Sequence, residues 1–179
     1  VDAGEWTLDR LLEITSDISQ ADSDGKWTEG AFYGVSCVDG NMLDSFYITS
    51  GQKLFEIEEG HLTTSKDITS AKTVGLYEKV YKAIYDDHII SYGANAGVTN
   101  YMFKNNKSVF GVMTVYNLKG IVDDAKDVGL LPFPKYIEDE RYRTLLGSPH
   151  TQYFIPFDAN KVDESAAVME TMAYASNLF

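Results

Sequence analysis

Acidic side chains are the most numerous groups in this sequence that could do chemistry. Four stretches place carboxylates close together along the chain: 56–59, 86–87, 123–124 and 138–140. A glycosidase needs two carboxylates about 5–9 Å apart across a cleft. Neighbouring residues on a loop or at a helix end do not provide that separation. We therefore interpret these stretches as solvated surface charge.

One acidic loop resembles the beginning of a calcium site. Asp22 and Asp24 precede Gly25, as the first and third ligands of an EF-hand loop precede its glycine. Such a loop needs a further ligand at its fifth position and a glutamate at its twelfth, but these positions hold Lys26 and Tyr33. The pattern favours a turn between a helix and a strand. We predict no metal site and no cofactor, with Asp22 and Asp24 as weak metal candidates.

The common catalytic motifs are missing from the sequence. His61, His88 and His150 stand far apart without the spacing of a zinc site. No phosphate-binding loop, dinucleotide fingerprint or nucleophile elbow occurs. A Ser/His/Asp triad stays open, although no motif points to one. The chain is expected not to be an enzyme.

Aromatic residues are the positive signal, because the chain has 12 Tyr, 9 Phe and 2 Trp. Sugars pack their C–H faces on aromatic rings, while their hydroxyls need Asn, Asp or Gln partners. Three stretches place such residues at expected strand or helix ends: 46–47, 116–117 and 152–154. They are candidates for contacts with a carbohydrate.

Composition excludes several classes of partner. The formal net charge is −12, from 15 Lys and Arg against 27 Asp and Glu. So negative a chain repels phosphate backbones and anionic lipid, which argues against nucleic acid and membrane surfaces. The apolar runs are too short to span a bilayer, and residues 1–5 do not read as a signal peptide. If the natural protein is exported, this chain is a processed or excised piece. The single cysteine, Cys37, is interpreted as a small buried hydrophobe.

Helical and strand patterns alternate along the chain. Helices are predicted at 7–19, 68–86, 99–105, 117–124 and 162–178, and strands at 31–38, 108–115, 128–131 and 152–155. Residues 53–57 and 61–64 predict a hairpin turning at 58–60. Residues 42–50 fit either type, 93–97 read as a loop, and 136–150 as a linker. The helix at 68–86 is predicted to bury one stripe: Val74, Tyr77, Val80, Tyr81 and Ile84.

This alternation predicts an α/β fold with a mixed, mostly parallel sheet flanked by helices. The chain length of 179 residues suits a single domain.

A succession of motifs resembles the extracellular solute-binding proteins of carbohydrate ABC importers. Residues 5–13 read EWTLDRLLE, 22–26 read DSDGK and 32–34 read FYG, similar to the family's WTWDELLE, DxDGDGK and YGF. Residues 103–110 read FKNNKSVF and 128–135 read VGLLPFPK, similar to FxxGKAAM and VGVLPLPK. Ile155-Pro156 resembles a later IPK. Two departures are Asn106 in place of the family's glycine, and Thr28-Glu29 at the end of the first loop.

The resemblance implies one lobe, the second, of a two-lobed protein with a type II periplasmic-binding-protein-like fold. The lobes would close about a hinge on a small solute, most commonly a sugar or oligosaccharide, for delivery to an ABC permease. The full-length protein would be extracellular, anchored as a lipoprotein, or periplasmic. The resemblance leaves open whether residues 157–179 belong to this lobe or to the other.

In the family, an aromatic residue that follows the strand after GKAAM stacks on the sugar. That position falls near Tyr116, with Met113, Thr114 and Asn117 beside it, and Tyr47 is a further aromatic candidate. Two other functions stay open: a carbohydrate-active enzyme domain and a surface interaction module. Polyamine, peptide and anion binders share related folds, so the residues do not name the solute.

Overall fold

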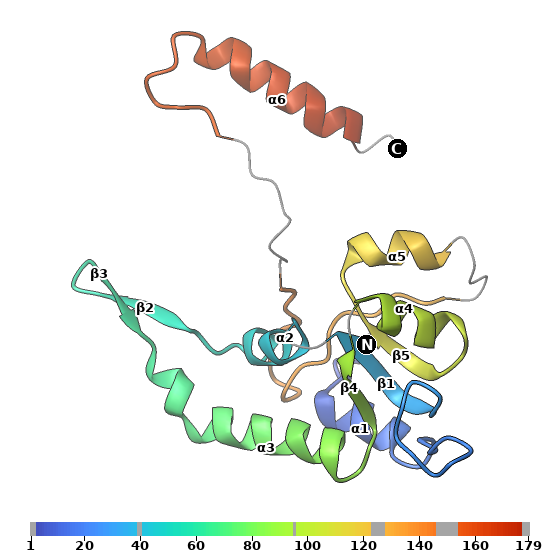
Figure 1. The fold of residues 1–179 in the computed structure, drawn as a ribbon. Coiled ribbons are helices and arrows are strands. Elements are labelled where there is room, and N and C mark those ends of the chain that lie inside the picture. The colour runs from blue at the N-terminus through green and yellow to red at the C-terminus, as the bar shows by residue number, and fades with distance from the viewer. Residues whose placement is uncertain (1–2, 39–40, 95, 123–127, 146–153, 177–179) are drawn as a thin grey trace. The chain divides into compact units, whose positions relative to one another are not determined.

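A computed structural model describes residues 3–38, 41–94, 96–122, 128–145 and 154–176 (Figure 1). The chain divides into two compact units, residues 1–145 and residues 146–179. Among the described residues, the strands and the helices α1 to α5 belong to the first unit. The second unit contains the helix α6 (Val162–Ser176), which the sequence predicts over 162–178.

The first unit is built on a parallel sheet of three strands. They are β1 (Tyr33–Val38), β4 (Ile90–Ala94) and β5 (Ser108–Val112), in the spatial order β4-β1-β5. Val35 of the central strand pairs with Ile90 on one side and with Phe110 on the other. Helices flank this sheet, so the predicted α/β class with mostly parallel strands is confirmed. The predictions for residues 31–38 and 108–115 are confirmed to within three residues at each end.

Strand β4 is missing from the sequence prediction, which reads residues 93–97 as a loop. The pattern Ile89-Ile90-Ser91 is too short to distinguish a buried strand from a helix end. Glycine and alanine at its end weaken the strand signal further. The pairing with β1 decides the conformation, because Ile90 is 1% exposed beside Val35.

The predicted hairpin is confirmed. β2 (Phe55–Glu58) and β3 (His61–Thr64) are antiparallel, and Glu58 pairs with His61 across the turn. Glu59 and Gly60 have φ angles of 51° and 82°. Positive φ at both turn residues is typical of the type I′ turn that matches the twist of a two-residue hairpin.

Helix α1 (Leu8–Thr15) begins where the sequence predicts. Thr7 caps it, because its hydroxyl oxygen accepts a hydrogen bond from the Arg10 N–H at 3.2 Å. The helix ends earlier than the predicted residue 19. Residues 42–50, which fit either type, form helix α2 (Asn41–Thr49).

Helix α3 (Ala71–Tyr85) follows a short 3₁₀ turn, η1 (Lys66–Thr69). The predicted helix is confirmed. Its predicted apolar stripe is confirmed at Val80 and Ile84 but wrong at the other three residues. Val74, Tyr77 and Tyr81 are 51%, 37% and 59% exposed. The buried positions form a stripe rotated around the helix: Thr73, Leu76, Val80, Ala83 and Ile84. Leu76 and Ala83 complete a buried face, whereas tyrosine rings are amphipathic and tolerate the surface.

Helices α4 (Ala96–Lys104) and α5 (Val115–Val122) flank β5 in the chain, near the predicted helices at 99–105 and 117–124. Two clusters form the core around the sheet. The larger joins α1, α2 and α3 to β1 and β4, with Leu8, Phe46, Leu76 and Val80 as members. The smaller places Met102 of α4 against Tyr33.

Residues 128–131 are not a strand, which corrects the sequence prediction. Leu130 and Leu131 are 74% and 46% exposed. Four residues later, Lys135 instead forms a parallel bridge with Thr7. Prolines at 132 and 134 have no N–H to donate to a ladder, which prevents a longer strand here.

Residues 136–145, predicted as part of a linker, pack onto the first unit. Tyr136 lies against α3, with the Lys72 and Lys79 ammonium groups 5.5 Å and 5.2 Å from its ring centroid. Residues 146–150 of the predicted linker and residues 152–153 of the predicted last strand lie outside the described residues. Phe154 and Ile155 are not in a strand.

Candidate functional site

The order of the strands defines one edge of the sheet as a candidate site. The chain runs from β1 to β4 on one side, and then through α4 to β5 on the other side of β1. The connections therefore reverse direction between β1 and β5. In open parallel sheets, ligands bind outside the carboxyl ends of the strands at such a reversal. Helices α2 and α5 begin next to these ends, at Asn41 and Val115.

The residues predicted after β5 lie at this edge. Thr114 is exposed and directly precedes α5, and Asn117 is half-buried in the first turn of that helix. The Asn117 N–H donates to the Thr114 carbonyl at 3.0 Å and to the Thr114 hydroxyl at 3.4 Å. Thr114 therefore acts as an N-cap for α5. The structure brings these two predicted residues together at a helix start, where backbone N–H groups lack partners within the helix.

The side chain of Met113, which follows β5 directly, lies against Gly111 of that strand. A Cβ atom added to Gly111 would lie 2.5 Å from the Met113 Cε and 3.1 Å from the Phe103 Cδ2. Gly111 therefore leaves the space that the Met113 and Phe103 side chains fill. Met113 is half-buried, and the end of its side chain lies next to Gly111 of β5.

The backbone of Tyr116 belongs to the first turn of α5. Its side chain lies outside what the structure describes. The predicted stacking contact of Tyr116 with a sugar therefore stays a prediction.

Tyr47 lies elsewhere, inside the contact between α2 and α3. It is 4% exposed, its hydroxyl donates to the Lys53 carbonyl at 2.8 Å, and its ring stacks on Tyr77. Burial raises the pKa of the Tyr47 phenol, and the nearby Asp67 carboxylate raises it further. A ring used in this way has little surface for a solute, so we leave Tyr47 out of the candidate site.

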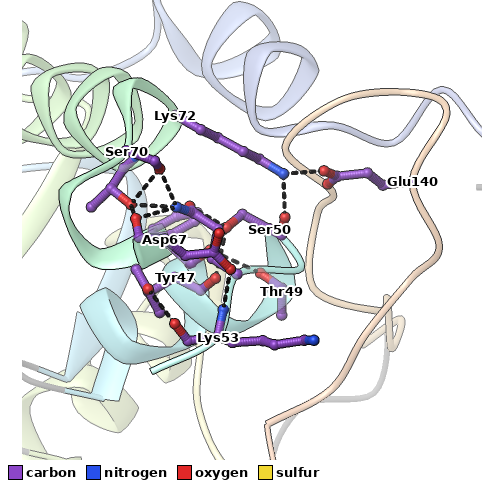
Figure 2. Close-up of polar contacts among 11 residues, drawn as sticks. Tyr47, Thr49, Ser50, Lys53, Asp67, Ser70, Lys72 and Glu140 are labelled. Atoms are coloured by element: carbon purple, nitrogen blue, oxygen red, sulfur yellow. Dashed lines mark hydrogen bonds and ion pairs between the residues drawn. The ribbon is translucent and has the colours of Figure 1, made fainter. Parts of the chain in front are cut away.

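A buried polar network surrounds Tyr47 and joins α2 to α3 (Figure 2). The Gln52 amide nitrogen donates to the Asp67 carbonyl at 3.2 Å, to the Ser70 hydroxyl at 3.1 Å and to the Thr73 hydroxyl. The Ser50 hydroxyl donates to the Gln52 side-chain oxygen at 2.8 Å. Gln52 is 6% exposed. Its own buried amide is thereby fully hydrogen-bonded, and it connects the end of α2 to η1 and the start of α3.

An ion pair connects the loop after Tyr136 to the start of α3 and the end of α2. Figure 2 shows the Lys72 ammonium reaching both the Ser50 carbonyl and the Glu140 carboxylate. The side chain of Glu140 is 14% exposed, so the pair is partly shielded from water. The network is a structural support, and sequence analysis missed it because its members are far apart along the chain.

Asp22 organises its loop through hydrogen bonds. Its carboxylate accepts from the Asp24 N–H at 3.0 Å, the Lys26 N–H at 2.8 Å and the Thr28 hydroxyl at 2.6 Å. These bonds, the one from Thr28 first, hold the pKa of the Asp22 carboxyl below its ordinary value of 3.8. Across the described ranges, no three His, Cys, Asp or Glu side chains gather in a way that would hold a metal ion.

The two described histidines, His61 and His88, lie in different environments. The His88 ring stacks on Trp27 with 4.5 Å between centroids, and His61 is exposed on β3. His150 lies outside the described residues. Cys37 is buried, as the sequence predicts, and its thiol donates to the Ser91 carbonyl at 2.8 Å.

Sequence analysis also missed the pairing of two distant segments. The Leu8 N–H donates to the Lys135 carbonyl at 2.7 Å, and the Lys135 N–H donates to the Trp6 carbonyl at 3.1 Å. The resemblance singles out both stretches, but their spacing along the chain does not predict that they pair.

Among the residues that the structure describes, none of the helices has the length and apolar character needed to cross a bilayer. Comparisons with protein-family models, with curated proteins and with solved structures give no match for this chain.

Proposed function

We propose that this chain is one lobe, the second, of a two-lobed extracellular solute-binding protein. The full-length protein binds a sugar or oligosaccharide without catalysis and delivers it to an ABC importer permease. It is extracellular and anchored as a lipoprotein, or periplasmic. The proposal starts from the succession of motifs in the sequence, and three structural observations support it.

The observation that supports it most is the reversal of connections between β1 and β5. It places the Thr114–Asn117 turn at the edge where parallel sheets bind small molecules. Thr114 and Asn117 offer hydrogen-bonding groups to sugar hydroxyls, and Met113 supports the strand end. Tyr116 supplies the stacking ring in this proposal.

The pairing of Trp6, Thr7 and Leu8 with Lys135 also supports the proposal. In a two-lobed protein, the segments that connect the lobes form a hinge, and a hinge made from adjacent segments lets the lobes rotate as rigid bodies. The segments around Thr7 and Lys135 run parallel and side by side, as adjacent hinge connections would.

The separate unit formed by residues 146–179 is a third support. It contains residues 157–179, which the sequence leaves open between the two lobes. In this proposal residues 157–179 of this unit contribute to the other lobe. Its helix α6 has exposed apolar side chains at Val168, Met172 and Tyr174, which further residues of that lobe would cover.

Calorimetry on the full-length protein with a panel of sugars tests the proposal. We expect one sugar class to bind, and Tyr116→Ala to weaken its binding at least tenfold, which corresponds to about 1.4 kcal/mol. Tyr101→Ala is the matched control, because Tyr101 is a half-exposed tyrosine on α4. Wild-type affinity in Tyr116→Ala would rule out the site.

A screen of chromogenic glycosides separates binding from catalysis. Glycoside hydrolysis needs a proton donor and a second carboxylate facing each other across the substrate, and we propose that this edge works through a ring, a hydroxyl and an amide instead. We therefore expect no hydrolysis. Turnover of any glycoside would favour the carbohydrate-active enzyme.

A further inference from the structure

The β2–β3 hairpin presents an uncovered apolar face. Phe55, Ile57 and Leu62 are 57%, 77% and 72% exposed. Ile57 pairs directly with Leu62, and Phe55 stands two residues before Ile57 on the same strand. Residues paired across strands, or two apart along one strand, lie on the same face of a ribbon. Figure 1 shows the hairpin projecting away from the three-stranded sheet.

The backbone of β2 is open on its outer edge. Within the part of the chain that the structure describes, β2 pairs with β3 alone. The Ser65 N–H donates to the Leu54 carbonyl at 3.0 Å, which fixes the alternation of bonded and non-bonded pairs. The N–H and C=O groups of Phe55 and Ile57 therefore point away from β3. Such an edge is a template for another strand.

The other face of the same ribbon is acidic. Glu56 and Glu58 alternate with Phe55 and Ile57 along β2, and no Lys or Arg occurs between Lys53 and Lys66. Glu58 and Glu59 line a shallow hollow with His61 and Thr63. Glu56 also accepts a hydrogen bond from the Ser65 hydroxyl, which holds its carboxylate in place.

The acidic face of β2 favours a basic partner strand over a second copy of this chain. A second copy of the chain would bring glutamates opposite glutamates, and like charges directly across a strand pair are destabilising. A strand with Lys or Arg opposite Glu56 and Glu58 gains a favourable pair of opposite charges at each position. Apolar residues at its alternate positions would extend the surface of Phe55, Ile57 and Leu62.

We propose that the outer edge of β2 is a docking site for an extended polypeptide segment that alternates apolar and basic residues. The segment adds as a third strand, with main-chain hydrogen bonds to Phe55 and Ile57. Its apolar side chains pack beside Phe55 and Ile57 on the apolar face, and its cationic side chains meet Glu56 and Glu58. This site is independent of the solute site that we propose at the end of β5.

Fluorescence anisotropy with labelled, capped peptides and the full chain tests the proposal. The probe is a peptide of alternating valine and lysine. Two controls are a valine–glutamate peptide of the same pattern and a peptide with the lysines grouped at one end. We expect the alternating valine–lysine peptide to bind at least about tenfold more tightly than either control. Equal binding of the alternating and grouped lysine peptides would show non-specific attraction and overturn the proposal.

Substitutions on β2 locate the site. We expect Ile57→Thr and Glu58→Gln each to weaken peptide binding by about three- to tenfold, because each removes one of the two recognition elements. Val109→Thr on β5 and Glu78→Gln on α3 are matched controls, since both positions are exposed. We expect wild-type affinity in the controls. Wild-type affinity in both β2 variants would overturn the proposal.

Discussion

The indole nitrogen of Trp6 donates a hydrogen bond to the carbonyl oxygen of Pro132 at 2.9 Å, across 126 residues of chain. The ring of Trp6 also lies 5.6 Å from that of Phe110 on β5. One side chain thus connects the start of α1, the sheet and the segment before Lys135. Trp6 is 8% exposed, so its N–H depends on this bond.

Trp6→Phe separates the hydrogen bond from the ring packing. We expect it to lower the free energy of unfolding by about 1–2 kcal/mol, because the bond is lost while most of the contact with Phe110 stays. Urea denaturation followed by circular dichroism measures this change. Trp27→Phe is the control, since Trp27 lies in a surface loop and is 36% exposed. An equal loss in both variants would contradict the assigned role of the Trp6–Pro132 bond.

Gly111→Ala tests the packing under the candidate site. The new Cβ would lie 2.5 Å from the Met113 Cε and 3.1 Å from the Phe103 Cδ2. Met113 can turn its flexible end away, so most of the cost comes from the Phe103 ring and is about 1 kcal/mol. Because Thr114 follows Met113, we expect weaker solute binding together with a lower melting temperature.

Gly120→Ala provides the matched control for Gly111→Ala. Nothing lies within 4 Å of its added Cβ, and alanine favours a helix by up to about 1 kcal/mol relative to glycine. We expect unchanged or higher stability. A melting temperature of Gly111→Ala at or above that of wild type would refute the close packing.

Gln52→Ala tests the buried network of Figure 2. The substitution leaves the Asp67 carbonyl and the Ser70 hydroxyl without the Gln52 donor. Both groups keep other partners, so the cost is that of the lost Gln52 hydrogen bonds, about 0.5–1.5 kcal/mol each. We therefore expect a loss of about 1–3 kcal/mol by chemical denaturation. Gln20→Ala, at an exposed position, serves as the control. A similar small loss in both variants would speak against a structural role for the network.

The stability contribution of Asp22 depends on pH. The folded-state pKa of Asp22 is lowered from 3.8 by hydrogen bonds to its carboxylate. The contribution is therefore present above about pH 3.8 and decreases as pH falls through the lowered value. We expect Asp22→Asn to melt below wild type at pH 7, and this difference to shrink below pH 3.8. Asp24→Asn controls for the loss of one charge from the same loop, and a pH-independent difference would be the contrary result.

Thr114→Val tests the hydroxyl at the candidate site. Valine keeps the shape of threonine and removes the hydrogen-bonding group, so we expect the bound sugar to dissociate more readily. A lost hydrogen bond of about 0.5–1.5 kcal/mol corresponds to roughly two- to thirteenfold weaker binding. Thr144→Val, at another exposed threonine, is the calorimetric control. Sugar affinity that is equal in the two variants would exclude the Thr114 hydroxyl from the site.

Local patterns predicted the helices and the hairpin well because their signals lie within a few residues. The Thr7 cap and the turn at Glu59-Gly60 are examples. Non-local contacts decided the rest. Strand β4 depends on pairing with β1, and the face that α3 buries depends on where Leu76 and Ala83 meet the core.

The candidate site was predictable only in part, for the same reason. The sequence and its resemblance point to residues 113–117, and the structure places Thr114 and Asn117 at a strand end and helix start. The strand order that makes this edge a candidate binding edge requires β4, which the sequence did not predict. Tyr47 was selected as an aromatic residue at an expected strand or helix end. It is buried and its ring stacks on Tyr77, a contact that residue type and position along the chain do not predict.

The bridge between Thr7 and Lys135 has a consequence for the order of folding. Residues so far apart meet late, because closing a long loop costs entropy before the contact repays it. During synthesis, Leu8 and Trp6 cannot receive their partners until Lys135 and Pro132 have left the ribosome. We therefore expect the local hairpin and α3 to form first, and the first unit to gain its full resistance to proteolysis only after translation passes this point.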